Sequence, residues 1–246
     1  MRPVRRSRCH VGRDFKTGVT PTAVAPTVLE VLVGRQIVPT RCQRLQLRDR
    51  DTRQSANTRG FTPANPTVDD NLYFSGSGGG TVTNTMANST ISSVNFITFN
   101  STAGAYTLAA NAGAAGASGG TALTVKGDII NNSASNQAIS MNLALGGSST
   151  GIINTAAGNI SISGVISGTG ALVKEGNRTL TFNGGKSYTG GTTINNGTLS
   201  VSAGALPTNI TINSGGTLVL ANHNMLTAGG NMTINSGTLN LSVYAQ

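Results

Sequence analysis

A short pattern that recurs near the C-terminus constrains the fold more than any other feature of this 246-residue sequence. The pattern is Thr-Ile-Asn, then Asn or Ser, then one or two glycines and Thr-Leu, and it occurs three times. Its isoleucines are Ile194, Ile212 and Ile234, which lie 18 and 22 residues apart. A repeat of about 20 residues is typical of proteins that stack one small structural unit on the next.

Each repeat has the pattern of two short β-strands joined by a corner. In the second repeat, Ile210 and Ile212 face one side and the threonine between them faces the other. Leu218 and Leu220 alternate with Val219 in the same way, as expected for half-buried strands. The Asn-Ser-Gly-Gly sequence between the two runs contains residues that readily adopt turn conformations. The repeat therefore predicts a strand, a turn and a second strand.

Two strands this short cannot bury their apolar side chains alone, but stacked units can. Stacking places Ile194, Ile212 and Ile234 in one column and a second set, Leu199, Leu218 and Leu239, in another. The earlier part of the chain shows the same alternation. There we expect these residues to face inward: Leu123, Val125, Ile139, Met141, Leu143, Leu145, Ile160, Ile162, Leu180 and Phe182.

We therefore predict an all-β fold, a parallel β-helix (a solenoid) with roughly 20 residues per coil and about nine coils over residues 65–246. The alternative is an antiparallel sandwich, because Asn-Asn-Gly and Asn-Ser-Gly also suit hairpins. Hairpins do not require the same apolar pattern to return at a fixed spacing, so the solenoid is favoured.

The charge is distributed unevenly and indicates two domains. Residues 1–60 hold 13 of the 17 Lys and Arg residues and have a net charge of +9, whereas residues 61–246 have a net charge of zero. We interpret residues 1–60 as an Arg-rich segment that is poorly structured or mis-assigned, and 61–246 as the β-helix. The basic stretch at residues 40–54 has no aromatic residues to stack on bases, so nucleic-acid binding is not expected.

The first 60 residues show no further signal for a site or for targeting. Cys9 and Cys42 are the two cysteines, and with His10 they match no zinc-binding spacing. We expect free thiols and no metal or other cofactor. Pro and charged residues interrupt the apolar run at residues 22–38, so no signal peptide is visible, and no run is long enough for a transmembrane helix.

Few residues after position 60 could support catalysis. They include four acids, four bases and one histidine. Asp69 and Asp70 are adjacent, so a strand would point them to opposite faces. Asp128 has no apparent acidic partner in the sequence, and His223 fits an exposed corner.

Lys174, Glu175 and Arg178 form the one charged cluster of this region, in a predicted loop. We interpret the cluster as a solvated turn with a local ion pair rather than as a clamp for an acidic sugar. A carbohydrate-active enzyme would require Asp128, Glu175 and Arg178 to converge on one face. We predict no catalytic, cofactor-binding or metal-binding residues.

The segment from Ser167 to Pro207 resembles the autotransporter-associated β-strand repeat, also called the passenger-associated transport repeat. The matching features are Gly168-x-Gly170-x-Leu172, Lys174-x-Gly176, Thr179-Leu180-Thr181-Phe182, Tyr188-Thr189-Gly190-Gly191-Thr192 and Gly197-Thr198-Leu199. The Asp-Asn-Leu-Tyr-Phe-Ser-Gly sequence at residues 70–76 is similar to the segment that precedes such repeats in large bacterial surface proteins. That segment usually follows one containing tryptophan, which this chain lacks.

The resemblance implies a right-handed parallel β-helix that is exported to the bacterial cell surface and continues into a C-terminal translocator. It implies a structural passenger segment that supports secretion, folding and surface display, without a small-molecule substrate. One alternative is an adhesin-like module that contacts glycans or other cells. The scarcity of exposed aromatic residues disfavours it. The second alternative is a carbohydrate-active β-helix enzyme.

Overall fold

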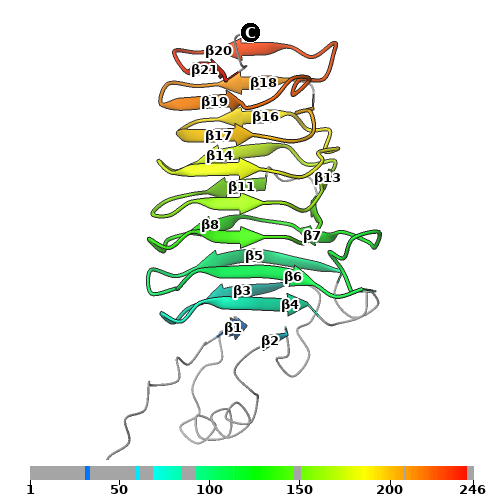
Figure 1. The fold of residues 1–246 in the computed structure, drawn as a ribbon, viewed down its shortest axis with the longest axis vertical. Helices are drawn as coiled ribbons and strands as arrows, with labels where there is room; N and C mark the ends of the chain where they lie inside the picture. The colour runs from blue at the N-terminus through cyan, green and yellow to red at the C-terminus, as the bar shows by residue number, and fades with distance from the viewer. Residues whose placement is uncertain are drawn as a thin grey trace, which may run out of the picture.

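The computed structural model describes residues 31–33, 59–60, 69–84, 92–112, 114–146, 151–207 and 209–242. Every regular element in these ranges is a β-strand, and the strands stack in chain order into one column (Figure 1). No helix in these ranges is long and apolar enough to cross a membrane. The division into residues 1–60 and 61–246 stays a prediction, because most of the first 60 residues lie outside the described ranges.

The strands form a 12-stranded sheet and a 9-stranded sheet, here called sheet A and sheet B. Sheet A contains β1 (Val31–Val33), β3 (Asp70–Phe74), β5 (Ser93–Phe99), β7 (Leu123–Val125), β8 (Ile129–Asn131), β10 (Leu143–Leu145), β11 (Gly151–Asn154), β13 (Ile166–Gly168), β14 (Leu172–Glu175), β16 (Thr192–Ile194), β18 (Ile210–Ile212) and β20 (Met232–Ile234). Sheet B contains β2 (Arg59–Gly60), β4 (Gly80–Asn84), β6 (Tyr106–Ala110), β9 (Gln137–Ile139), β12 (Ile160–Ile162), β15 (Thr179–Phe182), β17 (Gly197–Val201), β19 (Gly216–Leu220) and β21 (Thr238–Leu241).

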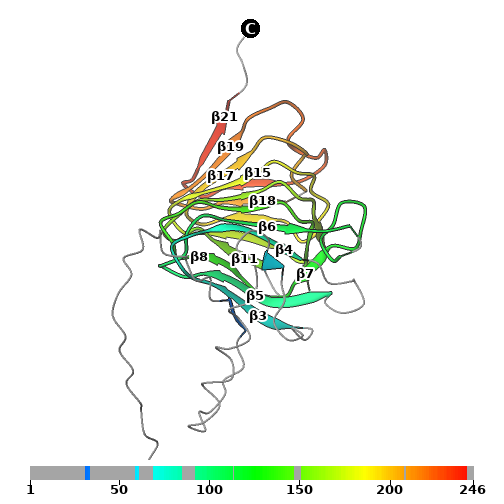
Figure 2. The same cartoon turned by 60° about the horizontal axis from the view of Figure 1, so that its bottom comes forward.

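The predicted parallel solenoid is confirmed. Among the described strands, every pairing except that of β1 with β3 is parallel, and each strand pairs with its counterpart in the next coil. In Figure 2 the column is tilted and its coils follow one another along one axis. The antiparallel sandwich is therefore wrong.

The number of coils is smaller than expected. The structure has about seven turns of about 21 residues each, where the sequence repeat predicted about nine. The early coils are longer, because Ile97 and Ile129 are neighbours in sheet A although they lie 32 residues apart. That coil contains β6 and the extra connection that precedes β7.

The core is a set of inward-facing columns, one for each side of the coil. Along sheet A, the strand register stacks Leu72, Ile97, Ile129, Ile153, Lys174, Ile194, Ile212 and Ile234. Along sheet B, it stacks Val82, Leu108, Ile139, Ile162, Phe182, Val201, Leu220 and Leu241. The two columns predicted for the C-terminal repeats are aligned as expected: Ile194, Ile212 and Ile234 in sheet A, and Leu199, Leu218 and Leu239 in sheet B. Complete burial of an isoleucine or leucine in these columns stabilises the fold by about 2 kcal/mol.

A third side of the coil is less regular. Leu123, Leu143 and Ile166 stack through β7, β10 and β13. Single bridges continue this side, from Ile166 to Lys186 and from Leu206 to Leu226. All ten residues predicted to face inward in the earlier segments are buried. The third side explains why Met141, Leu143 and Leu145 are buried although they follow β9.

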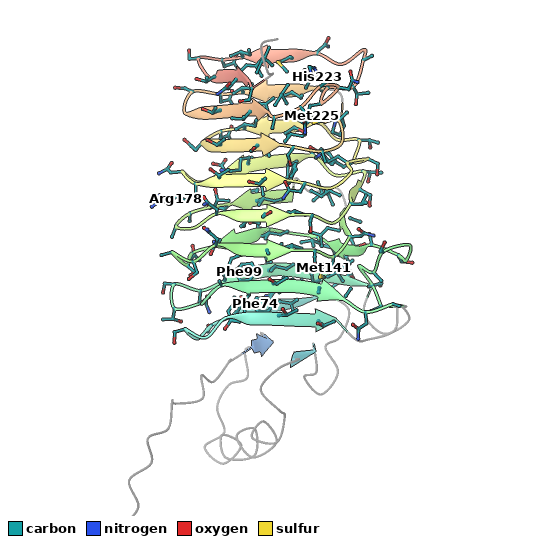
Figure 3. The ribbon with its side chains drawn as sticks, viewed as in Figure 1. Phe74, Phe99, Met141, Arg178, His223 and Met225 are labelled. Carbon is teal, nitrogen blue, oxygen red and sulfur yellow. The ribbon has the colours of Figure 1, made fainter. Side chains whose placement is uncertain are left out.

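An aromatic cluster fills the N-terminal coils, where the columns contain larger side chains. The ring centroids of Phe74 and Phe99 are 5.0 Å apart, and those of Phe74 and Tyr106 are 5.7 Å apart (Figure 3). The Tyr106 hydroxyl donates to the carbonyl oxygen of Ser75 at 2.7 Å. This buried phenol is therefore hydrogen-bonded as well as packed.

The two ends of the column of coils differ. At one end, β1 pairs with β3 in the antiparallel sense. At the other end, β20 and β21 form the last described coil, and Ile234 and Leu241 are 47% and 56% exposed. The two residues continue the core columns but contribute less burial than their counterparts in the middle.

This difference gives a stability prediction. Leu199→Ala empties a fully buried site in the middle of the column, so the free energy of unfolding should fall by about 2–5 kcal/mol. Leu241→Ala removes the same atoms from a half-exposed site and should cost less than about 1 kcal/mol. Urea unfolding followed by circular dichroism measures both. Equal losses would contradict the assignment of the core.

Candidate functional site

Lys174 is the charged residue that lies deepest in the described part of the chain. It occupies the sheet A core column, between Ile153 and Ile194, and its side chain is fully buried. Its ammonium group donates to the carbonyl oxygens of Glu175 and Gly176, both at 2.7 Å, and of Asn196 at 3.0 Å. The three N–H groups of the ammonium can therefore all be hydrogen-bonded.

The predicted solvated turn with a local ion pair is wrong for this cluster. Lys174 points into the core, and no ion pair joins it to Glu175 among the described residues. The Glu175 carboxylate instead accepts hydrogen bonds from the side-chain amides of Asn195 and Asn196. Arg178 is exposed at the edge of the column (Figure 3). The sequence analysis placed Lys174 in a loop, because lysine is rarely buried, whereas it lies in β14 and faces inward.

Lys186 is held by carbonyl oxygens in the same way as Lys174, on the third side of the coil. Its ammonium donates to the carbonyl oxygens of Gly184 at 2.8 Å and Gly204 at 3.1 Å, and also to that of Ala203. It also lies 5.6 Å from the ring centroid of Phe182. Burial lowers the pKa of Lys186 to about 8. Burial also lowers the pKa of Lys174 to about 8, while the Glu175 carboxylate acts in the opposite direction.

An asparagine ladder runs along the outer face of sheet A from Glu175. Asn195 donates to the Glu175 carboxylate, Asn213 donates to the Asn195 side-chain oxygen at 2.7 Å, and Asn235 donates to that of Asn213 at 3.0 Å. These residues follow directly after β16, β18 and β20, so the strand register aligns them. The ladder is directional, because each amide donates toward the preceding coil and the series ends at a carboxylate.

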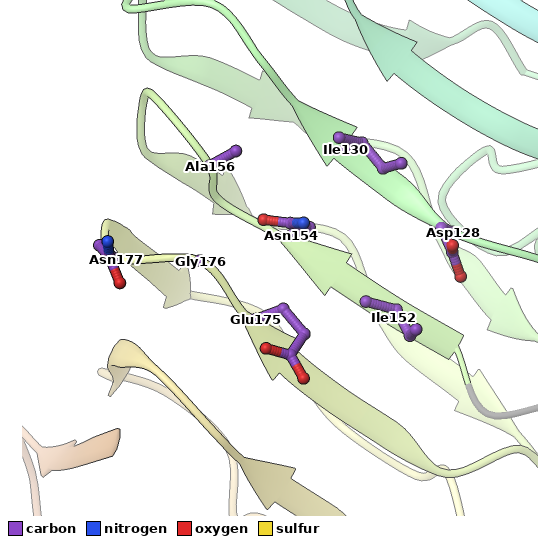
Figure 4. Close-up of a pocket in the computed structure, with 8 residues that line it drawn as sticks. All are labelled: Asp128, Ile130, Ile152, Asn154, Ala156, Glu175, Gly176 and Asn177. Atoms are coloured by element: carbon purple, nitrogen blue, oxygen red, sulfur yellow. The ribbon is translucent and has the colours of Figure 1, made fainter. Parts of the chain in front are cut away.

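Asp128 and Glu175 line one shallow hollow on the outer face of sheet A (Figure 4). Ile153 pairs with Ile129, and Asn154 pairs with Glu175, so the two acids lie two strands apart and are offset by two residues. This geometry places their backbones about 12 Å apart. The hollow is also lined by Ile130, Ile152, Asn154, Ala156, Gly176 and Asn177.

This placement tests the convergence that an enzyme would require. Asp128, which had no apparent partner in the sequence, does share a hollow with Glu175, but Arg178 does not line it. No group of three or more His, Cys, Asp or Glu side chains in the described ranges is arranged to hold a metal ion. The three residues that the enzyme alternative would require on one face therefore do not all line this hollow.

The remaining candidates are distributed along the column. Asp69 pairs with Lys126 at 2.7 Å and accepts a hydrogen bond from Ser93, and these contacts lower the pKa of the Asp69 carboxyl. His223 lies in an exposed turn, as predicted. The side chain of Asp70 and the residues Cys9, His10 and Cys42 lie outside the described set.

Two motif glycines shape the corner between the sheets. Gly176 and Gly197 have φ angles of 79° and 65°, which side-chain-bearing residues rarely adopt. A Cβ atom on Gly197 would lie 2.4 Å from the Gly176 carbonyl oxygen, so successive corners approach too closely for a side chain.

Tyr188 is buried on the third side, and its hydroxyl lies 2.6 Å from the Thr192 hydroxyl. Burial raises the pKa of the Tyr188 phenol.

The buried Lys174 and the partly buried Lys186 predict a dependence of stability on pH. Below about pH 8 both the folded and the unfolded chain carry the ammonium, so the cost of burying it is fully present. Between about pH 8 and pH 10.5 the folded chain has released the proton and the unfolded chain still binds it. The free energy of unfolding should therefore rise across this window, by an amount on the order of 2 kcal/mol for Lys174.

Urea unfolding midpoints across the same pH window measure this rise. Lys174→Met should lose about half of it, because Lys186 has a similarly lowered pKa. The double variant Lys174→Met, Lys186→Met should lose nearly all of it. An unchanged rise in the double variant would show that the two lysines are not its source.

The ladder predicts the effect of adding one charge. Asn195→Asp replaces the amide that donates to Glu175 by a second carboxylate, so the free energy of unfolding at pH 7 should fall by about 1–3 kcal/mol. At about pH 3 the loss should be smaller, because carboxyl groups begin to protonate there. Asn235→Asp is the matched control, since it makes the same change away from Glu175. Equal losses in the two variants would contradict the ladder.

Comparison with known proteins identifies the repeats. The sequence model of the passenger-associated-transport-repeat family matches residues 172–201 and 211–241. The first segment runs from the start of β14 to the end of β17, and the second runs from within β18 to the end of β21. No curated protein and no solved structure matches the chain. The match to this family agrees with the predicted resemblance and covers two adjacent repeats, residues 172–201 and 211–241.

Proposed function

We propose that this chain is a structural segment of an exported bacterial surface protein, which supports secretion, folding and surface display without catalysis. The observation that carries the proposal is the match of two adjacent repeats to a family associated with passenger transport. The similarity to this family also supports a location outside the cell. The columns that run through both repeats fit a role in which the stacked structure itself is the functional product.

The physical basis of such a role is stepwise folding. Each coil contacts only its neighbours in a solenoid, so a partly exported chain can add one coil at a time to a structure that already exists. Each added coil buries residues such as Ile212 and Leu218 against the previous one. The free energy released on stacking then opposes a return through the membrane.

The experiment expresses the 246-residue chain between a secretion signal and an outer-membrane translocator, and measures surface exposure by protease accessibility. Ile212→Asp places an unpaired charge in the core column, which costs several kcal/mol, and should strongly reduce surface display. Thr211→Asp is the matched control, because Thr211 faces outward in the same strand. Display that is equal in the two variants would contradict the proposal.

The native product provides a second test. Peptide mapping of surface and soluble fractions of the source cells should recover peptides of residues 61–246 from the surface fraction. Recovery of the chain from the cytoplasmic fraction alone would overturn the proposed export.

A further inference from the structure

The hollow between Asp128 and Glu175 combines an apolar floor with acidic ends. Its floor contains Ile130 and Ile152, which face outward from β8 and β11 and are partly exposed. The column of Ile152 continues on the outer face with Val173 in the next coil and with Thr193 and Thr211 in the two coils after it. The outer face of sheet A therefore changes from apolar to polar two coils beyond Ile152.

The Asp128 end is suited to a cation. Phe96 lies on the neighbouring strand β5 and is 38% exposed, and its Cε1 atom is 2.7 Å from where a Cβ atom of Gly127 would lie. The ring therefore covers Gly127, directly beside Asp128. A carboxylate next to an exposed aromatic ring attracts an ammonium group through its charge and through a cation–π interaction.

The Glu175 end contains the second carboxylate, which already accepts hydrogen bonds from Asn195 and Asn196. The side-chain oxygen of Asn154 is buried and has no hydrogen-bond partner, and Asn154 pairs with Glu175 across the strands. No Lys or Arg side chain is among the eight residues that line the hollow. The buried Lys174 ammonium lies close to Glu175, so we expect this end to attract a cation less strongly than the Asp128 end.

We propose that this hollow binds an aliphatic polyamine, a linear molecule whose methylene chain lies over Ile130 and Ile152 while its ammonium groups approach Asp128 and Glu175. The two acids lie about 12 Å apart at the backbone, a separation that an extended polyamine of the length of spermidine can bridge and putrescine cannot. This binding site goes beyond the structural role proposed above and does not depend on it.

The test is a titration of the full chain with spermidine, followed by calorimetry or by NMR shifts of the isoleucine methyl groups. Spermidine should bind weakly, with Kd on the order of 1 mM at low salt, because the site is open to solvent. Putrescine should bind at least about threefold more weakly, because it reaches only one carboxylate. Equal affinities for spermidine and putrescine would overturn the bridging geometry.

Three variants locate the site. Asp128→Asn and Phe96→Ala should each weaken spermidine binding by about threefold, and Glu175→Gln should weaken it less. Asp69→Asn is the matched control, because it removes the same charge outside the hollow and should leave the affinity unchanged. Circular dichroism verifies that each variant is folded.

Two results would overturn the proposal. An equal loss of affinity in Asp69→Asn and Asp128→Asn would show that spermidine responds only to the overall charge. Displacement of spermidine by a lysine-rich peptide that binds more tightly would assign the hollow to a basic protein segment instead.

Discussion

The parallel register between successive coils is the constraint on which the rest of the structure depends. Each strand pairs with the equivalent strand one coil later, so every residue lies above a residue of the same position in the repeat. An apolar position thus becomes a column of the core, and an asparagine position becomes a ladder. A single repeat does not contain this structure, because short strands bury their apolar side chains only after stacking.

Two lysines show how much polarity such a core can accept. Lys174 and Lys186 lie in positions that other coils fill with isoleucine or leucine. Both side chains are long enough to extend past the apolar column and place their ammonium groups among the carbonyl oxygens of the corners. The desolvation of the charge is offset by hydrogen bonds, and the backbone oxygens of the corners gain a charged donor.

The sequence predicted the architecture well, because one face of each strand follows a strict alternation. Ile194, Ile212 and Ile234 lie in the predicted column, and the earlier inward-facing residues are buried as expected. The hollow was beyond prediction, since Asp128 and Glu175 line it together only because β8 and β14 both pair with β11. Lys174 was misjudged because local alternation identifies the inward side of a strand but does not show where a long side chain ends.

The buried Lys174 also helps to determine which coil stacks on which, in a structure whose coils are otherwise similar. A solenoid with similar columns in every coil could shift by a whole coil and still place isoleucine over isoleucine. After such a shift, the Lys174 ammonium would keep the carbonyl oxygens of Glu175 and Gly176, which follow it directly in the chain, but would lose that of Asn196 in the next coil. A lost hydrogen bond to a buried charge costs about 1.5–3 kcal/mol. Lys174 therefore favours the alignment in which the coil of Asn196 stacks directly on its own.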